Sequence, residues 1–295
     1  MNPLDKEQLI EDRSTGLGGT DAGAICGINP WKTACDVYLE KIGSSQKKEE
    51  SSGETLHRLE MGNRLEGTVI DVFEDRMKIK VQRDIPVIRH PKFPYLLAHV
   101  DGLIDGDNGI KGVFEAKTAG ANAIFNKSWG PSNTTNASKE DIPIQYYYQI
   151  MWYLTITNRQ FAYLAVLLGG IDDFRVYYFE RDYGLGLKMR KKLKNFWLEN
   201  VKKRIAPEPV TQIDSFNLYP NQKLEDLKPC DEKTLRVVLK DKNLRQEMKQ
   251  LFNQKERLDA VITSFIGTAK GIEHEGRIIA TWKETKNNKR ILRLY

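Results

Sequence analysis

The chain has 295 residues, of which 40% are hydrophobic and 29% charged, and its formal net charge at pH 7 is +6. This composition is typical of a globular protein and excludes a disordered or fibrous chain. No run of about 18 apolar residues occurs and residues 1–12 are polar, so we expect neither a membrane-spanning helix nor a secretory signal. The cysteines, Cys26, Cys35 and Cys230, form no C-x-x-C pair, which argues against a disulfide framework, a zinc ribbon and an iron–sulfur cluster. A reducing cytoplasm is the expected location.

The first third of the chain combines a glycine-rich motif with two helices. The motif, GLGGTDAG from Gly16 to Gly23, is not a P-loop, because no G-K-[ST] follows it. It is also a poor dinucleotide-binding fingerprint, because no β-branched strand precedes it. Residues 32–42 predict a short helix, and apolar residues at helical spacing predict an amphipathic helix over residues 54–76.

The middle of the chain predicts a sheet with helices. Strand-like segments cover residues 79–82, 85–89, 96–104 and 112–117, and the turn-forming cluster at 105–109 predicts a hairpin between the last two. The elements predicted next are a Gln- and Tyr-rich helix over 143–157, a strand pair over 161–168 and 174–179, and a basic helix over 185–204. This order predicts an α/β (α+β) fold with helices on the faces of a sheet.

The last third predicts a separate helical region. Residues 206–230 contain several prolines and are interpreted as a linker between a first domain, residues 1–205, and a C-terminal region, residues 231–295. Within that region we expect a long helix over 235–266, broken once, and a terminal β-hairpin formed by residues 278–282 and 291–294.

Three charged residues lie in the predicted hairpin, where apolar residues surround them. Asp101 stands in one strand, and Glu115 and Lys117 stand in the other. Side chains alternate between the faces of a strand, so Glu115 and Lys117 share a face, and antiparallel pairing can bring Asp101 beside Glu115. Two carboxylates and the backbone carbonyl of Ala116 suit Mg²⁺ or Mn²⁺, and Lys117 could hold a water or neutralise a phosphate.

The [D/E]-x-K pattern alone is weak, since it occurs five times in the chain. Only the copy at Glu115 and Lys117 lies on an apolar strand with an aspartate on the strand before it. The alternative interpretation is an ion pair between Glu115 and Lys117 on an edge strand, with Asp101 as a surface acid near a turn. On the hairpin alone, the two interpretations are equally good.

Two helices offer further candidates for the same site. Glu66, in the first amphipathic helix, could reach the hairpin and bind a second metal; the alternative is a solvent-facing acid. Gln145 and Gln149 lie one turn apart on the Gln- and Tyr-rich helix, where amide and phenol groups could hold a water or a phosphate. The alternative for this helix is ordinary amphipathic packing with tyrosine hydroxyls at the surface.

A nucleic-acid-binding surface is predicted from charge and from aromatic residues. Residues 181–204 hold nine Lys or Arg against two acids, and Lys191 and Lys192 are the candidates for phosphate contacts. A solvated helix face explains the same charges. Trp129, in a polar loop, and Trp31 could stack on a terminal base pair, although an ordinary packing role is the simpler interpretation for Trp129.

Taken in order, these motifs resemble a known family. The series runs from Arg13 through Gly18-Gly19-Thr20-Asp21 and Gly27-x-Asn29-Pro30 to Gly62-x-x-Leu65-Glu66, then Asp101-Gly102, Glu115-x-Lys117 and Gln149. It resembles the YqaJ-type phage recombinase exonucleases, which are relatives of the lambda-type phage exonuclease in the PD-(D/E)xK nuclease superfamily. Val100 replaces the proline of the superfamily's name, a position that varies widely.

This resemblance implies a restriction-endonuclease-like core and a metal-dependent exonuclease that digests linear duplex DNA from 5′ to 3′ and leaves a 3′ single strand. It also implies that Asp101 and Glu115 bind Mg²⁺, that Lys117 acts in catalysis and that Glu66 and Gln149 complete the site. Arg13 and Thr20 match the motif that contacts the DNA end. A phage single-strand annealing partner, a homotrimeric ring and a phage or prophage gene expressed in a bacterial cytoplasm are implied as well.

Two other functions are compatible with these residues. The same fold supports a structure-specific or site-specific endonuclease, which would also cut closed circular DNA. A catalytically silent DNA-binding protein is a third possibility, but the complete set of Asp101, Glu115 and Lys117 argues against it. A helicase-nuclease with an iron–sulfur cluster is disfavoured by the cysteine spacing.

Overall fold

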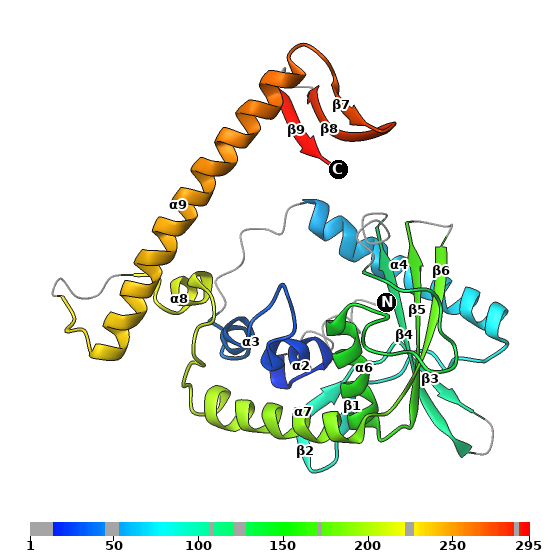
Figure 1. Ribbon diagram of the computed structural model, residues 1–295. Helices are drawn as coiled ribbons and strands as arrows, with labels where there is room; N and C mark the ends of the chain where they lie inside the picture. Colours follow the sequence, from blue (N-terminus) through cyan, green and yellow to red (C-terminus); the bar gives the residue numbers. More distant parts are fainter. Residues whose placement is uncertain are drawn as a thin grey trace. The chain divides into compact units, whose positions relative to one another are not determined.

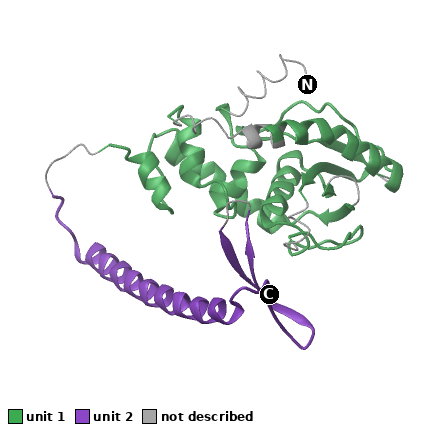
Figure 2. Cartoon of the chain, turned by 90° about the horizontal axis from the view of Figure 1, so that it is seen from above, with its two compact units in different colours: residues 1–221 green, residues 222–295 purple. Residues whose placement is uncertain are grey.

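The computed structural model describes residues 14–44, 53–106, 109–120, 128–169, 173–221, 227–285 and 289–295. The chain divides into two compact units, Met1–Asn221 and Gln222–Tyr295 (Figure 2). Each unit is described by itself below. Arg13, the first residue of the predicted DNA-contacting motif, lies outside the described residues.

A four-stranded mixed sheet is the centre of the first unit. Its strand order is β3-β4-β5-β6, formed by β3 (Gly102–Asp105), β4 (Lys111–Ala119), β5 (Phe161–Leu168) and β6 (Asp173–Glu180). The outer pairs are antiparallel, whereas β4 and β5 are parallel. Parallel neighbours need a crossover connection, and α6 (Ile144–Thr157) lies in that connection. The predicted mixed sheet with flanking helices is confirmed.

Helices pack on the two faces of this sheet (Figure 1). On one face, α6 packs together with α2 (Gly19–Cys26) and α7 (Tyr183–Asn195) around the larger hydrophobic core. On the other face, α4 (Gly53–Met77) packs through Val69, Ile70 and Phe73 onto Phe114. The amphipathic helix predicted over 54–76 is therefore confirmed, and its apolar stripe covers the sheet.

The predicted strand over residues 96–104 is in fact two strands of different sheets. Residues up to Ala98 belong to β2 (Phe93–Ala98), which pairs with β1 (Ile88–His90), whereas β3 begins at Gly102. The strands predicted over 79–82 and 85–89 reduce to a single bridge between Gln82 and Leu103 and to the short β1. The backbone of Asp84 is left-handed, with φ of 55°, and interrupts any continuous strand there.

The predicted linker over residues 206–230 is corrected in its first part. Residues 212–218 form α8 (Gln212–Leu218), which packs against α3 (Ala34–Lys41). The buried carboxylate of Asp214 accepts hydrogen bonds from the hydroxyl of Thr33 at 2.6 Å and from the backbone N–H of Val210 at 2.9 Å. The first unit therefore extends to Asn221, beyond the expected boundary at residue 205.

The second unit consists of the long helix α9 (Glu232–Ile266) and a three-stranded antiparallel sheet of β7 (Gly271–His274), β8 (Arg277–Glu284) and β9 (Arg290–Leu294). The predicted break in the helix is absent, because no glycine or proline occurs between residues 232 and 266. The predicted hairpin gains β7 as a third strand. Glu275 and Gly276 both have positive φ and make the two-residue turn between β7 and β8.

None of the helices in the described ranges has both the length and the apolar character needed to cross a membrane.

We predict that Asp214→Ala destabilises the first unit by about 1–3 kcal/mol, because it leaves buried N–H and hydroxyl groups without an acceptor. Chemical denaturation measures the change. Gln212→Ala, an exposed substitution on the same helix, serves as the control and should change stability by less than about 0.5 kcal/mol. Equal effects of the two substitutions would contradict the docking of α8 against α3.

Candidate active site

The acidic residues of the site are placed by the alternation of side chains along β4. Phe114 and Ala116 point into the core under α4, while Glu115 and Lys117 point to the face covered by α6. Glu115 is only 1% exposed. A carboxylate in this position requires compensation by hydrogen bonds or by a positive charge, because burial of a bare charge is unfavourable.

Asp101 reaches the same place from the neighbouring strand. Gly102 pairs with Phe114 in the antiparallel register, so Asp101 is level with Glu115, as predicted from the hairpin. The side chain turns back onto β4, where its Oδ2 accepts a hydrogen bond from the backbone N–H of Ala116 at 2.8 Å. Asp101 lies in a bend immediately before β3 begins, which allows this orientation.

Glu115 is held by two donors on one of its oxygens. Its Oε1 accepts hydrogen bonds from the ammonium of Lys117 and from Nε2 of Gln149, the latter at 2.9 Å. Its Oε2 is buried and has no hydrogen-bond partner among the described residues. Asp101 and Glu115 are also within hydrogen-bonding reach of each other, so a proton shared between the two carboxyl groups or a bound cation would satisfy this oxygen.

The charges of the site shift each other's protonation. Burial and the negative charge of Asp101 raise the pKa of Glu115 to about 8. Burial likewise raises the pKa of Asp101, although Lys117 and the Ala116 N–H act against it. Burial alone would lower the pKa of Lys117, but Glu115 and Asp101 outweigh it and raise that pKa. One lysine therefore does not suffice to keep both acids ionised, and a bound cation would favour their charged forms.

Glu66 approaches this group from α4. Burial and the charge of Asp101 raise the pKa of Glu66 to about 7, with Lys117 acting in the opposite direction. Gly62, one turn earlier on α4, lies close enough to β4 that a Cβ there would be 3.7 Å from Oγ1 of Thr118. Within the described ranges, no three His, Cys, Asp or Glu side chains form a group that could hold a metal, so Glu66 does not join Asp101 and Glu115 in one. A second metal at Glu66 remains a prediction.

Tyrosines of α6 complete the surroundings of Lys117 and Gln149. The ring of Tyr146 lies with its centroid 5.3 Å from the ammonium of Lys117, and Nε2 of Gln149 also donates to the hydroxyl of Tyr153 at 2.8 Å. Tyr153 was not predicted from the sequence. The available signal was its position one helical turn beyond Gln149.

The glycine-rich motif packs directly against this helix. A Cβ on Gly19 would lie 2.6 Å from Cε1 of Tyr153 and 2.9 Å from Cγ of Gln149, so only glycine fits. Asp21 of the same motif is buried and forms ion pairs with Lys32 at 2.9 Å and Lys41 at 2.8 Å. This cluster, which sequence reasoning missed, fixes the start of α2 beside Gln149.

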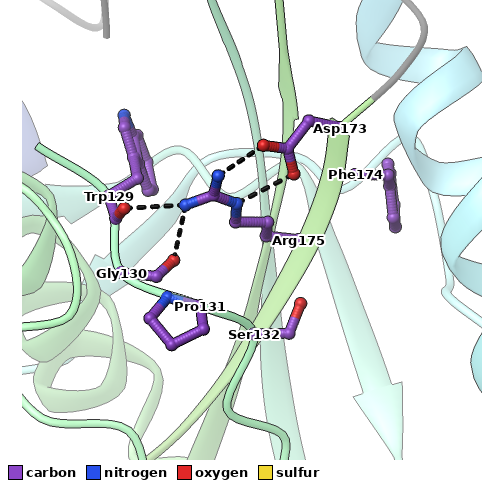
Figure 3. Close-up of a pocket in the computed structure, with 7 residues that line it drawn as sticks. All are labelled: Trp129, Gly130, Pro131, Ser132, Asp173, Phe174 and Arg175. Carbon is purple, nitrogen blue, oxygen red and sulfur yellow. Dashed lines mark hydrogen bonds and ion pairs between the residues drawn. The ribbon is translucent and has the colours of Figure 1, made fainter. Parts of the chain in front are cut away.

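Trp129 packs in the interior, as the simpler of the two interpretations from the sequence expected, and its burial argues against the predicted stacking on DNA. Its side chain is 5% exposed and stacks on Tyr146 with ring centroids 5.5 Å apart. The hollow that it lines lies against Arg175, whose guanidinium binds Asp173 and the carbonyl oxygens of Trp129 and Gly130 (Figure 3). Those donors are already used within the protein. Trp129 therefore packs against Tyr146, the tyrosine whose ring faces the ammonium of Lys117.

The remaining predicted DNA-binding residues lie on the helices next to α6. Thr20 is exposed in the first turn of α2, and Lys191 and Lys192 are exposed on α7, which packs against α2. Lys192 is close enough to Cys26 to act on its pKa, although burial raises that pKa overall. Trp31 is 70% exposed just after α2. The structure thus places these exposed candidates on or next to two helices, α2 and α7, that pack against each other.

The residues fit a hard divalent cation. Asp101, just before β3, and Glu115 on β4 could each offer a carboxylate oxygen, and Oε2 of Glu115 is buried with no hydrogen-bond donor within the described part of the chain. Mg²⁺ and Mn²⁺ prefer carboxylate, carbonyl and water oxygens. The carbonyl of Ala116 remains a predicted further ligand.

The site and fold define a mixed-sheet protein with an acid–acid–lysine centre, and comparison with known proteins gives its class. Residues 9–160 match the family described as the YqaJ-like viral recombinase domain. The uncharacterized protein YqaJ of Bacillus subtilis (strain 168) is 34% identical over 206 residues, covering 69% of this chain and 59% of the relative. The chain therefore matches about three fifths of the length of that relative.

The family match covers more than half of the chain, and the protein belongs to the family of YqaJ-like viral recombinase domains. Its fold is also similar to the crystal structure of an alkaline exonuclease (LHK-Exo) from Laribacter hongkongensis. The TM-score is 0.50 at 16% sequence identity, covering 68% of this chain and 94% of that chain.

We predict that the metal-free protein loses stability as the pH rises toward 8. Because the pKa of Glu115 is raised, the folded state holds a proton on this residue at pH values where the unfolded state has released it. The contribution of this proton to the free energy of unfolding is complete below about pH 4.5 and is lost as the pH rises through about 8. Glu115→Gln replaces the ionisable carboxyl group with a neutral carboxamide. It should raise the free energy of unfolding at pH 8.5 by about 1–3 kcal/mol relative to the unsubstituted protein.

Denaturation in EDTA across pH 5–8.5 measures this difference. Glu180→Gln, at the exposed end of β6, provides the control and should leave the pH profile unchanged. Parallel profiles for Glu115→Gln and the unsubstituted protein would contradict the electrostatic account of the site.

Proposed function

We propose that the protein is a metal-dependent deoxyribonuclease, a 5′-to-3′ exonuclease that hydrolyses phosphodiester bonds of linear double-stranded DNA. The observation that carries the proposal is the pairing of the half-buried Asp101 with the buried Glu115 beside Lys117, with Oε2 of Glu115 lacking a hydrogen-bond donor in the described ranges. The exonuclease-like fold supports it. Phosphodiester hydrolysis needs charge neutralisation, a positioned water and a held substrate, and these residues are suited to each task.

Asp101 and Glu115 would hold Mg²⁺ or Mn²⁺, together with the carbonyl of Ala116. When bound, the cation supplies Lewis acidity and lowers the pKa of water. Gln149 orients Glu115 by donating to its Oε1, and Lys117 shares that oxygen. The ammonium of Lys117 is then placed to neutralise the scissile phosphate or to hold the attacking water. Glu66, with its raised pKa, is the candidate to accept a proton or to bind a second metal.

The DNA would lie along the face formed by α2 and α7. Lys191 and Lys192 would contact phosphates without reading the base sequence, as digestion of any DNA end requires. Thr20 and Arg13 would contact the DNA end. Trp31, which is 70% exposed, takes the stacking role that the buried Trp129 cannot perform.

The biological setting is proposed from the family. The 3′ single-stranded tails would serve homologous recombination by strand annealing, with a phage annealing protein as partner, in the cytoplasm of a bacterial host. A homotrimeric ring that encloses the duplex remains a prediction.

Digestion of end-labelled linear duplex with and without Mg²⁺ tests the activity, with 5′-phosphorylated and unphosphorylated ends compared. We expect cleavage only with the cation and only from ends, with closed circular duplex left intact. Cutting of the circle would identify an endonuclease on the same fold. Absence of cleavage with Mg²⁺ and also with Mn²⁺, while DNA is still bound, would identify a catalytically silent DNA-binding protein.

We predict that Lys117→Ala and Glu115→Gln each lower the cleavage rate by at least about 10²–10³-fold, since each removes a group that stabilises charge in the transition state. DNA affinity, measured in Ca²⁺ or EDTA, should stay within a few-fold of that of the unsubstituted protein. Lys111→Ala, an exposed lysine on the same strand, is the matched control and should cleave normally. Normal cleavage by Lys117→Ala would exclude this site.

We predict a different effect for Lys191→Glu combined with Lys192→Glu. Loss of two phosphate contacts should weaken binding and reduce the slope of log affinity against log salt by about 2. Turnover at saturating DNA should be preserved. The control is Lys242→Glu with Lys249→Glu, which makes the same charge change on α9. Lost turnover with unaltered binding would contradict a DNA-binding role for α7.

A further inference from the structure

The helix α9 exposes apolar side chains along most of its length and takes no part in the proposed nuclease site. Leu244, Leu251 and Leu258 are 47%, 63% and 64% exposed, and Phe265 is 79% exposed. Among the residues of α9, only Ile266, at its end, is buried. The three-stranded sheet of the same unit leaves the helix uncovered (Figure 1). Exposed apolar surface on this scale is typical of an interaction site.

These apolar residues follow a heptad repeat. One position of the repeat is apolar in five consecutive heptads, occupied by Val237, Leu244, Leu251, Leu258 and Phe265. A second position, three residues before each of these, is apolar at Met248 and Ile262 and polar at the other three, Thr234, Asp241 and Lys255. A strict seven-residue spacing keeps such residues on one seam only if two helices supercoil around each other. The pattern therefore indicates a helical partner.

Charge selects the partner and its direction. The second heptad position also carries Asp241 and Lys255, fourteen residues apart. Parallel pairing in register would place Asp241 against Asp241 and Lys255 against Lys255. In an antiparallel pair, Met248 can lie level with Leu251 of the second copy. This register keeps all five heptads paired. It also brings Asp241 next to Lys255 of that copy. Opposite charges then meet in neighbouring layers.

We propose that α9 forms an antiparallel coiled coil with α9 of a second copy of this chain. Its seam consists of the five-heptad apolar position, Val237 to Phe265, with Met248 and Ile262. Asp241 and Lys255 are each paired within their own helix, with Arg245 at 2.6 Å and with Asp259 at 2.5 Å. Charges inside the seam weaken a coiled coil but specify its register, and here they specify the antiparallel one.

The first test measures the mass of the full-length protein by light scattering and sedimentation over a range of concentrations. Leu244→Glu combined with Leu251→Glu should halve the mass, whatever association the nuclease unit makes by itself. Gln246→Glu combined with Asn253→Glu adds the same charge to the opposite face of α9 and should leave the mass unchanged. Circular dichroism and cleavage of linear duplex verify that each variant is folded.

The second test concerns direction. Exchanging one ion pair, Asp241→Arg with Arg245→Asp, keeps the bond within the helix but sets like charges against Lys255 of the second copy. It should weaken association at least tenfold. Exchanging the other pair as well, Lys255→Asp with Asp259→Lys, should restore association. Parallel pairing predicts no such rescue, because each charge would still face its own copy.

Three results would overturn the proposal. These are a mass that the seam substitutions leave unchanged, a chain that shows no concentration-dependent association, and a failure of the double exchange to restore association. In the first two cases, the apolar face of α9 does not pair with a second copy.

Discussion

The site depends on two carboxylates that are forced together inside the protein with a single lysine. The register of β3 and β4 sets Asp101 beside Glu115, and the alternation of β4 puts Lys117 on the same face. Because the two acids repel each other and are shielded from water, the pKa of Glu115 rises to about 8. This arrangement is unfavourable by itself, and the proposed cation would stabilise it by favouring the ionised forms of both acids.

The surrounding structure holds this centre in place by layers of packing. Gln149 donates to Glu115, and Gly19 of α2 packs closely against Gln149 and Tyr153. Tyr146 faces Lys117 and is supported from behind by the buried Trp129. The start of α2 is itself fixed by the ion pairs of Asp21. The glycine-rich motif therefore acts as part of the site, although it is distant from β4 in sequence.

The two units differ in how much of their apolar surface is buried. The first buries apolar surface on both faces of its sheet and uses the burial to perturb charged groups. The second buries little, and its α9 exposes an apolar seam with charges at regular positions. Burial raises the pKa values of the acids in the first unit, whereas an association surface is exposed to solvent in the single chain. In the two proposals made above, the first unit carries the cleavage site and the second unit carries the association surface.

Local patterns in the sequence were sufficient to predict the helices α4 and α6, the strand pair β5–β6 and the meeting of Asp101, Glu115 and Lys117, because periodicity and hairpin pairing act over short distances. Tertiary structure alone decided the rest. It buried Trp129, divided residues 96–104 between two sheets and docked α8 through Asp214. These outcomes depend on contacts between residues far apart in the chain, and no local pattern records such contacts.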